Sequence, residues 1–321
     1  MKNNSTKIEI AKHLQSVENE KIVASASKEI KTKKFEENRF IYHMVLPFMW
    51  LLVGYVKTKK ALYNFFGLGK PKINTMFFDG LGKSSRKVKE YATTWKALDI
   101  VYNHPFSHKK TIGNMIDEFY WNGLNCQGLR NRRKLIKDEL RKAILKIAKT
   151  KKEIQIISLA CGSAEVMIEL IAEMKEKGII VKALLIDIDE KALSRATSIA
   201  EDLRVKNQIK AERNNIYEIK NISKKFNPDI IEMMGFLDYL KYNDAIKIAR
   251  IINESMSENC YFITCNISSN IEKDFLTHVI DWPMVYRTPK ELLAIGVKAG
   301  FSENRVIYEP LRIHGILVSK K

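Results

Sequence analysis

Two acids, Asp187 and Asp189, close the apolar run that begins at Ile179, and they follow a turn of small residues, Cys161–Ala164, by about 20 positions. The turn itself follows an apolar run over 154–160 and precedes a helical pattern of apolar residues. Strand, tight turn, helix, strand and terminal acid make one βαβ unit, in which such an acid holds the hydroxyls of a ribose. The spacing therefore predicts a binding site for a ligand that contains adenosine.

The chain beyond Asp189 keeps alternating helix and strand, which predicts an α/β fold with a doubly wound, mostly parallel, Rossmann-like sheet. Such a sheet binds its ligand at the carboxyl ends of its strands. The last helix has a clear start, with Thr288 as N-cap and Pro289 at its first position, and it stops at Gly300. The other expected elements are a helix over 190–203, a short run near 209, a strand over 229–234, a helix over 245–256, a strand over 260–267 and two final strands over 305–308 and 313–319.

The first part of the chain is expected to be mainly helical. Apolar and aromatic residues recur at three- and four-residue spacing over 88–102, which predicts a single helix there. Further helices are expected around 112–120 and 135–147. We therefore divide the chain into a basic, mainly helical N-terminal region, 1–124, and a ligand-binding domain, 125–321.

The net charge is unevenly distributed along the chain. Residues 1–150 contain 30 Lys and Arg against 13 Asp and Glu, whereas residues 151–321 contain 25 against 24, so nearly all of the net charge of +18 lies in the N-terminal part. A basic region of this kind suits a polyanion or an anionic membrane surface. A solvated, lysine-rich surface would give the same excess, so both interpretations stay open.

A run of 17 uncharged residues, Phe40–Val56, lies in this basic region with Arg or Lys on both sides. Its length is at the lower limit for a membrane-spanning helix, and Pro47 interrupts it. The favoured interpretation is a helix buried against its own domain. The alternatives are a segment held at an anionic membrane surface by Trp50, Tyr55 and the flanking lysines, and a single membrane span.

The cysteine pattern favours a reducing compartment. The four cysteines form no C-x-x-C pair and no disulfide framework, so a cytoplasmic protein is expected, with membrane association left open. Cys260 and Cys265 are five positions apart on a predicted strand and should face opposite sides, so no metal site is predicted. Residues 1–38 lack the order of segments in a signal peptide and are expected to form an exposed helix or a frayed arm.

Three arginines, Arg130, Arg132 and Arg133, stand just before the βαβ unit. Guanidinium groups can bind a carboxylate or a phosphate through two hydrogen bonds, which suits a ligand-facing role, with Arg130 and Arg132 ahead of Arg133. A solvated helix face is the other interpretation.

Three segments, in this order, resemble the class I S-adenosylmethionine-dependent methyltransferases over roughly residues 125–321. The resemblance implies a seven-stranded sheet with an antiparallel terminal hairpin, a methyltransferase activity and S-adenosyl-L-methionine as the cofactor. The segments are Ser158-Leu159-Ala160-Cys161-Gly162-Ser163-Ala164, then Leu184-Leu185-Ile186-Asp187-Ile188-Asp189, then Arg287-Thr288-Pro289-Lys290-Glu291-Leu292 with Ala299-Gly300-Phe301.

Carried over by position, the resemblance implies that Asp187 holds the ribose hydroxyls, Ile188 packs on the adenine and Asn214 meets the adenine amino group. The strand end at 232–235 would face the methionine portion of the cofactor. Asp187 could instead cap the following helix, and Asn214 could be an ordinary loop residue. The predicted cofactor-binding residues are Ser158, Ala160, Cys161, Gly162, Ser163, Asp187, Ile188, Asn214, Glu232 and Met233.

The sequence departs from the family at the methionine end of this site. The family commonly has an acid at the position of Ser158, which helps to hold the amino group of the methionine moiety, and glycines at those of Ala160 and Ala164. Without the acid, this contact falls to Ser158, to backbone carbonyls or to an acid elsewhere, such as Glu165. Alanine for glycine is a small steric change if the backbone stays at negative φ.

The reaction implied by the resemblance is an in-line displacement at the sulfonium methyl, for which the protein aligns the acceptor and excludes water. A general base is needed only for a protonated hydroxyl or amine, and the candidates at predicted strand ends are Glu232, Asp238, Tyr239 and His314. The methyl acceptor is not identified by the sequence. A lipid or other hydrophobic small molecule is favoured, because Phe40–Val56 lies between basic flanks.

Three other functions stay open at this point. An RNA methyltransferase fits the same positive charge, although nucleic acid is the less favoured partner. A non-catalytic scaffold that keeps the fold fits the departures at Ser158 and Ala164. A nicotinamide dehydrogenase fits less well, because its turn ordinarily needs glycines to approach a pyrophosphate.

Overall fold

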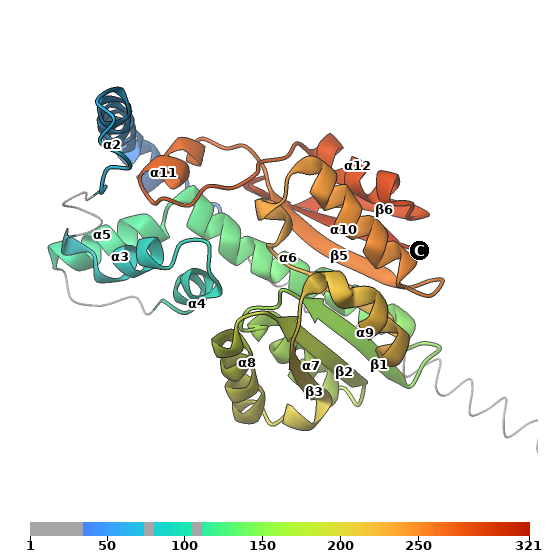
Figure 1. Cartoon of the computed structure of the whole chain (residues 1–321). Helices are drawn as coiled ribbons and strands as arrows, with labels where there is room; N and C mark the ends of the chain where they lie inside the picture. The colour runs from blue at the N-terminus through green and yellow to red at the C-terminus, as the bar shows by residue number, and fades with distance from the viewer. Residues whose placement is uncertain (1–34, 74–79, 105–110) are drawn as a thin grey trace, which may run out of the picture.

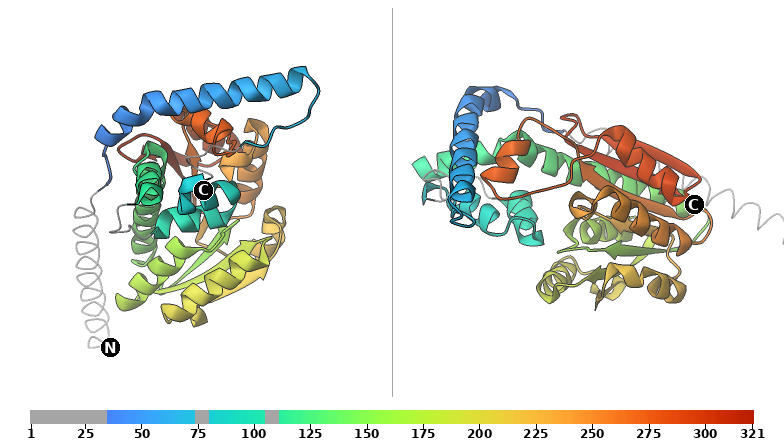
Figure 2. Two further views of the ribbon diagram at one scale, coloured as in Figure 1. Left: turned by 90° about the vertical axis from the view of Figure 1, so that its left-hand side faces the viewer. Right: turned by 45° about the horizontal axis from the view of Figure 1, so that its top comes forward.

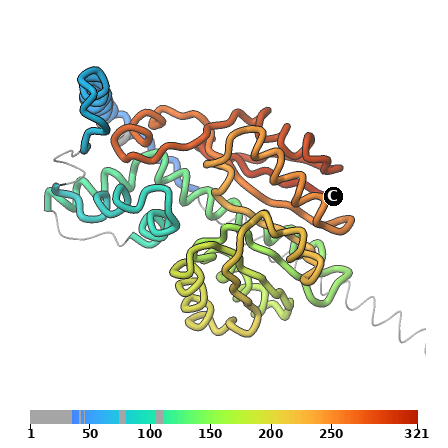
Figure 3. The backbone as a smooth tube through the Cα atoms, in the orientation of Figure 1, coloured from blue at the N-terminus to red at the C-terminus, as the bar shows by residue number. Residues whose placement is uncertain are grey.

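The structure is a computed structural model that describes residues 35–73, 80–104 and 111–321. Most of the expectation for residues 1–38 therefore lies outside the described residues. Figure 1 shows an α/β domain on one side and a group of helices on the other, and Figure 3 traces the same path as a tube.

A seven-stranded sheet forms the centre of the α/β domain. Its strand order is β3-β2-β1-β4-β5-β7-β6, and β7 alone runs antiparallel to its neighbours. This order confirms the predicted mostly parallel, doubly wound sheet with an antiparallel terminal hairpin. The strands are β1 (Glu153–Leu159), β2 (Ile180–Asp187), β3 (Ile209–Arg213), β4 (Ile230–Met233), β5 (Tyr261–Ile267), β6 (Glu303–Tyr308) and β7 (His314–Lys320).

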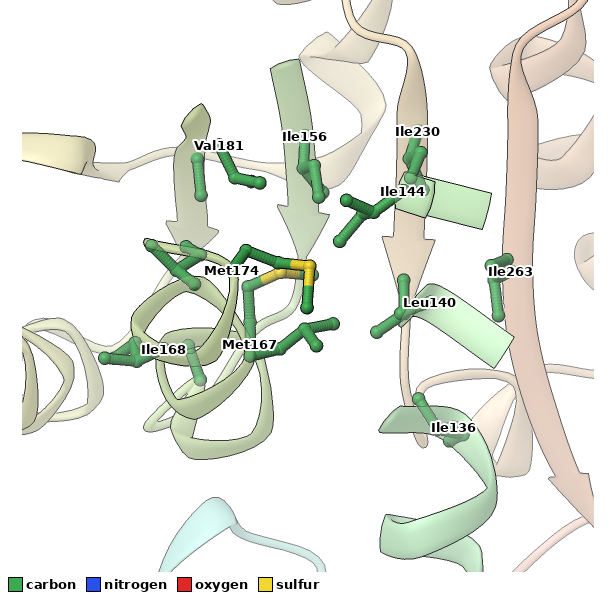
Figure 4. Close-up of a cluster of buried hydrophobic side chains, with 14 of the residues drawn as sticks. Ile136, Leu140, Ile144, Ile156, Met167, Ile168, Met174, Val181, Ile230 and Ile263 are labelled. Carbon is green, nitrogen blue, oxygen red and sulfur yellow. The ribbon is translucent and has the colours of Figure 1, made fainter. Parts of the chain in front are cut away.

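Helices cover both faces of the sheet, because successive residues of a buried strand point to opposite sides and both sides are apolar. Isoleucines and leucines of α6 and methionines of α7 fill one core against β1, β2 and β4 (Figure 4). Cys265 belongs to this core and Cys260 to the opposite one, so the two thiols face opposite sides as predicted. The helices of the first face are α6 (Leu124–Ile147), α7 (Glu165–Glu176) and α8 (Glu190–Asp202), and those of the second are α9 (Ile219–Phe226), α10 (Tyr242–Glu254) and α12 (Pro289–Ala299).

The remaining helices lie beyond the carboxyl ends of the parallel strands (Figures 1 and 2). The single helix predicted over 88–102 is wrong, because the chain breaks it at Thr93, which has a φ of 70°, and Thr94 is extended. A threonine in the left-handed region cannot continue a right-handed helix. These helices are α2 (Phe40–Phe65), α3 (Lys83–Glu90), α4 (Trp95–Asn103), α5 (Ile112–Trp121) and α11 (Lys273–His278).

Helix α6 joins the two parts of the molecule. Its first amide groups lie beyond the sheet, where the backbone N–H groups of Leu124 and Asn125 donate to the buried carboxylate of Glu272, at 2.8 and 2.7 Å. An acid at a helix N-terminus satisfies amides that have no partner within the helix. Glu272 comes from the segment after β5, so the start of α6 is fixed to the carboxyl edge of the sheet.

The interpretation favoured for Phe40–Val56, a helix buried against its own domain, holds for only one side of helix α2. It packs along one stripe, in which Met49, Val53 and Val56 are buried, and it contacts α11. Most of the other large apolar side chains described on this helix are exposed. Of the helices in the described residues, none has the length and hydropathy that a membrane span requires.

Candidate cofactor site

The turn after β1 is built from residues with unusual backbone angles. Ala160, Gly162 and Ala164 have φ values of 48°, 55° and 48°, and α7 begins at the next residue, Glu165. The condition under which alanine would be a small change is therefore not met, since both alanines occupy the left-handed region that favours glycine. The backbone at Ala160 and Ala164 thus has the left-handed conformation that suits glycine, although both residues are alanine.

Asp187 ends β2 and braces this turn. Its Oδ2 accepts a hydrogen bond from the Gly162 amide at 2.8 Å, and its Oδ1 accepts one from the Asp189 amide at 2.9 Å. Asp187 does not cap the following helix, because the N-cap of α8 is Asp189, whose side chain accepts from the Lys191 amide. A carboxylate has about four acceptor positions, so two remain for the hydroxyls of a ribose.

The adenine side of the site has the features that a nucleoside needs. Ile188 directly follows Asp187 and is 68% exposed, which is unusual for an isoleucine and leaves its side chain available to an aromatic base. The Asn214 amide donates to the Asp187 carbonyl at 3.1 Å, so β3 ends beside β2, while the Asn214 side-chain oxygen accepts from Asn215. These residues fit the adenosine part of S-adenosylmethionine.

Helix α4 covers the turn from the N-terminal side. The indole nitrogen of Trp95 donates to Asp189 Oδ2 at 2.8 Å and lowers the pKa of that carboxyl. A Cβ placed on Gly162 would lie 2.9 Å from the Trp95 Cβ, so this close approach requires glycine. Asn103, at the other end of α4, donates to Glu165 at 3.1 Å. The N-terminal region thus lies over the predicted cofactor turn.

The methionine side of the site contains a buried acid that is paired across two strands. Ser158 and Glu232 are opposite each other in the β1–β4 register, and Ser158 Oγ donates to Glu232 Oε2 at 2.5 Å. Burial raises the pKa of Glu232 to about 7, against the opposing effects of this hydrogen bond and of the Arg132 charge. Met233 is fully buried in the core that includes residues of α9 and α10, so its side chain has no exposed surface to offer the predicted cofactor contact.

Two of the three arginines of α6 are committed to ion pairs. Arg130 binds Glu36 through two hydrogen-bond donors and Arg133 pairs with Glu169. Arg132 differs in its burial: its Nη2 donates to the Tyr102 hydroxyl at 2.8 Å, its Nη1 lies 3.8 Å from the buried Asp238, and its Nε has no hydrogen-bond partner among the described residues. The solvated-face interpretation is therefore wrong for Arg132.

The candidates for a general base are not equivalent. Asp238 is buried, accepts from the Ile267 amide at 2.7 Å and lies 3.8 Å from Arg132, which gives it a structural role. The Tyr239 hydroxyl accepts from the Trp282 indole at 2.9 Å. His314 is buried at the start of β7, its two ring nitrogens have no partner in the described residues, and burial together with Arg132 lowers its pKa well below its usual value.

Some residues of the site were not identified from the sequence. Trp95 and Tyr102 belong to the aromatic residues from which only a helix over 88–102 was predicted, and the structure places Trp95 on the Gly162 turn and Tyr102 against Arg132. The spacing alone could not distinguish the two, since core and ligand-facing stripes share the same helical period. The break at Thr93 is what turns α4 toward the turn.

The sheet order, the turn and the acid-ended β2 together define the fold of a class I methyltransferase. The chain matches the family described as "Putative methyltransferase" over residues 88–319, and it belongs to this family. The predicted class of enzyme, an S-adenosylmethionine-dependent methyltransferase, is thereby confirmed. The match begins within α3, so the family includes the helices that cover the cofactor turn as well as the α/β domain.

Solved structures share this fold at low identity. A protein of Bordetella parapertussis described as a possible exported protein aligns over 85% of this chain and 95% of its own, at 14% identity and a TM-score of 0.64. The magnesium protoporphyrin IX methyltransferase of Synechocystis PCC 6803 with bound S-adenosylmethionine aligns over 74% of this chain and 96% of its own, at 11% identity and a TM-score of 0.50. No curated protein matches the chain.

Proposed function

We propose that this chain methylates a lipid or another hydrophobic small molecule that it reaches at an anionic membrane surface. The observation that carries the choice of acceptor is the exposed apolar face of α2. The methyltransferase class rests on the family, and the acceptor rests on this surface.

The cofactor would lie across the carboxyl ends of β1 and β2. Asp187 would hold the ribose hydroxyls, Ile188 would pack on the adenine and Trp95 would close the turn from above. S-adenosylmethionine supplies a methyl group on a sulfonium, which is already an activated leaving group. The protein therefore has to align the acceptor and keep water from the methyl group.

Among Asp238, Tyr239 and His314, we assign the proton of an acceptor hydroxyl or amine to His314, because its two ring nitrogens have no hydrogen-bond partner among the described residues. Burial and the neighbouring Arg132 charge keep its imidazole neutral, and a neutral imidazole nitrogen is a proton acceptor. Asp238 and Tyr239 already accept hydrogen bonds from Ile267 and Trp282. An acceptor that carries no acidic proton would need no base.

The exposed face of α2 suits a lipid surface. Large apolar and aromatic side chains project from it, and the helix contains three lysines and no acid. An amphipathic helix with apolar and basic residues binds an anionic bilayer by inserting its apolar side chains among the headgroups, and lysines add electrostatic attraction. The exposed side chains are Phe40, Met44, Phe48, Trp50, Leu51, Tyr55, Leu62 and Phe65.

A groove beside α2 extends this surface. It has a volume of about 530 Å³ and is lined by α2 and by the segment 270–275. Lys57 on α2 pairs with Asp274 across it at 2.5 Å, which holds the helix to the segment that follows β5. The surface proposed to meet the lipid thus reaches the segment that follows β5.

Sedimentation with lipid vesicles tests this proposal. The full chain is expected to bind phosphatidylcholine vesicles that contain phosphatidylserine and to bind pure phosphatidylcholine more weakly. Leu51→Asp places a charge on the α2 face, and it should weaken vesicle binding about tenfold, because it replaces the burial of one leucine side chain. Val297→Asp is the matched control, since Val297 is exposed on α12, away from α2, and its replacement should leave vesicle binding unchanged.

The same preparation distinguishes the alternative acceptor. Failure to bind the anionic vesicles, together with salt-dependent binding of a single-stranded RNA, would contradict the lipid proposal and support an RNA acceptor. Equal losses for Leu51→Asp and Val297→Asp would show that α2 is not the surface involved.

A further inference from the structure

The methionine end of the site lacks the acid that the family carries on β1, because Ser158 stands at that position. We propose that Glu232, on the neighbouring strand β4, supplies the missing carboxylate and binds the amino group of the cofactor's methionine moiety. This inference rests on the cofactor placement given under the proposed function and identifies how one part of that site works.

The sheet register places Glu232 beside the position of the missing acid. Ser158 and Glu232 are direct partners across β1 and β4, and their side chains share a face of the sheet. The hydrogen bond of 2.5 Å from Ser158 Oγ holds the Glu232 carboxylate against the residue that stands in place of the acid. Two residues further along the chain, Ala160 begins the turn that leads to Gly162.

The other candidate for this contact is already engaged. Glu165 Oε1 pairs with Arg133 at 3.1 Å and its Oε2 accepts from Asn103 at 3.1 Å. Asp187 is held at the ribose end by Gly162 and Asp189. Glu232 is thus the acid whose position matches the missing group.

The surroundings of Glu232 favour a positive ligand. Its carboxyl is buried and accepts from the Ser158 hydroxyl and the Met234 backbone amide. The charged or titratable groups near it are Arg132 of α6, Cys161 of the turn and Cys265 of β5. A buried carboxylate is costly in a dry environment unless a cation or several donors neutralise it. Arg132 directs its Nη2 to Tyr102 instead, so an ammonium group would supply a full charge partner.

Calorimetry with two related ligands tests the inference. S-adenosylhomocysteine carries the amino acid portion, whereas 5′-methylthioadenosine keeps the nucleoside and the thioether but lacks the amino group. Glu232→Gln should weaken S-adenosylhomocysteine binding about tenfold to hundredfold, the usual worth of a charged hydrogen bond, and change methylthioadenosine binding less than about twofold. Glu254→Gln is the control, because Glu254 is an exposed acid at the end of α10, and it should change neither affinity.

A proton readout separates a charge contact from a general disturbance. Because the free carboxyl of Glu232 has a pKa of about 7, binding an ammonium at pH 6.5 should release protons, as buffers of different ionisation enthalpy will report. The Glu232→Gln variant should release none. Its folding is checked by comparing its circular dichroism and its methylthioadenosine affinity with those of the unchanged chain.

The outcomes distinguish this inference from the function on which it rests. If the unchanged chain binds neither ligand, the cofactor placement itself is wrong and the inference falls with it. If the chain binds both ligands but Glu232→Gln loses them equally, or loses neither, the cofactor placement stands and the role of Glu232 is wrong.

Discussion

The two ends of the cofactor site are built in different ways. The ribose end comes from one stretch of chain, in which Asp187 braces Gly162 and Asp189 caps the next helix. The methionine end is assembled from β1, β4 and α6, and its two central residues, Ser158 and Glu232, are 74 positions apart in sequence. When one βαβ unit forms a site, the binding residues are close together in sequence. When several elements form it, a carboxylate at the same place in the site can come from either of two neighbouring strands.

The largest effect is expected at the ribose end. Asp187→Ala removes the carboxylate that would accept both ribose hydroxyls, so S-adenosylhomocysteine and methylthioadenosine should each bind about a thousandfold more weakly, or by about 4 kcal/mol. Isothermal calorimetry measures both affinities. Loss of only one ligand would break the proposed division of the site into two ends.

Glu190→Ala is the control for that experiment. Glu190 is an exposed acid three residues further on, and it pairs with the exposed Arg213 at 2.9 Å. Its replacement should leave both affinities unchanged. If Glu190→Ala matched Asp187→Ala, the effect would be one of local charge and not of ribose binding.

At the methionine end, the Glu232 carboxyl should lower the stability of the ligand-free chain while it strengthens cofactor binding. Burial raises the pKa of Glu232 from 4.5 to about 7, so the folded chain binds a proton more tightly than the unfolded chain does. This carboxyl therefore makes the protein less stable as pH rises from 4.5 to 7. Glu232→Gln removes that penalty and should raise the free energy of unfolding by about 3 kcal/mol at pH 8, with little change at pH 4.5.

Urea unfolding of the ligand-free chain and the variant at both pH values measures this difference. A variant that is less stable than the unchanged chain at pH 8 would show that Glu232 has a structural role. A variant that is more stable but binds S-adenosylhomocysteine poorly would support a ligand-binding role for Glu232, because the unchanged carboxyl would then lower stability and raise affinity.

Much of the fold and the ribose end could be predicted from the sequence, because both depend on local patterns. The alternation of apolar runs, the Thr288 capping box and the distance from the turn to Asp187 are all properties of nearby residues. Pairing between distant strands is not local, so the Ser158–Glu232 contact could not be read from either segment alone. The sequence could only show that an acid was absent at Ser158.

The N-terminal helices illustrate the same limit. The helix predicted over 88–102 is correct for α4 and for the last residues of α3, but the left-handed residue Thr93 and the extended Thr94 separate the two helices. The length and apolarity of Phe40–Val56 were evident, yet how much of α2 is covered depends on α11, which is distant in sequence.

Trp95, which covers the turn from α4, should contribute less to cofactor affinity than Asp187 or Glu232. Trp95→Ala removes the hydrogen bond to Asp189 and the contact on Gly162, and we expect S-adenosylhomocysteine to bind about tenfold more weakly, with most of the change in its dissociation rate. Trp95→Phe keeps an aromatic ring and should lie between the two. Stopped-flow fluorescence measures the rates, and unchanged dissociation in Trp95→Ala would mean that α4 is not a cover.

The smallest effect is expected from the turn alanines. Ala160 and Ala164 are sterically strained in the left-handed region, where glycine is not. Glycine opposes this gain in part, because it raises the conformational entropy of the unfolded chain. Ala164→Gly should therefore stabilise the chain by about 0.5–1 kcal/mol, whereas the control Ala172→Gly within α7 should destabilise it by about 1 kcal/mol. Thermal unfolding of both variants measures this, and equal destabilisation would contradict the glycine-type geometry of the turn.

A crystal structure of the chain with S-adenosylhomocysteine tests the placement of both ends of the cofactor in one measurement. We expect the ribose hydroxyls on Asp187 and the amino group within about 3.2 Å of the Glu232 carboxylate. A nucleoside bound away from the turn, or an amino group held only by backbone carbonyls with Glu232 turned aside, would contradict it.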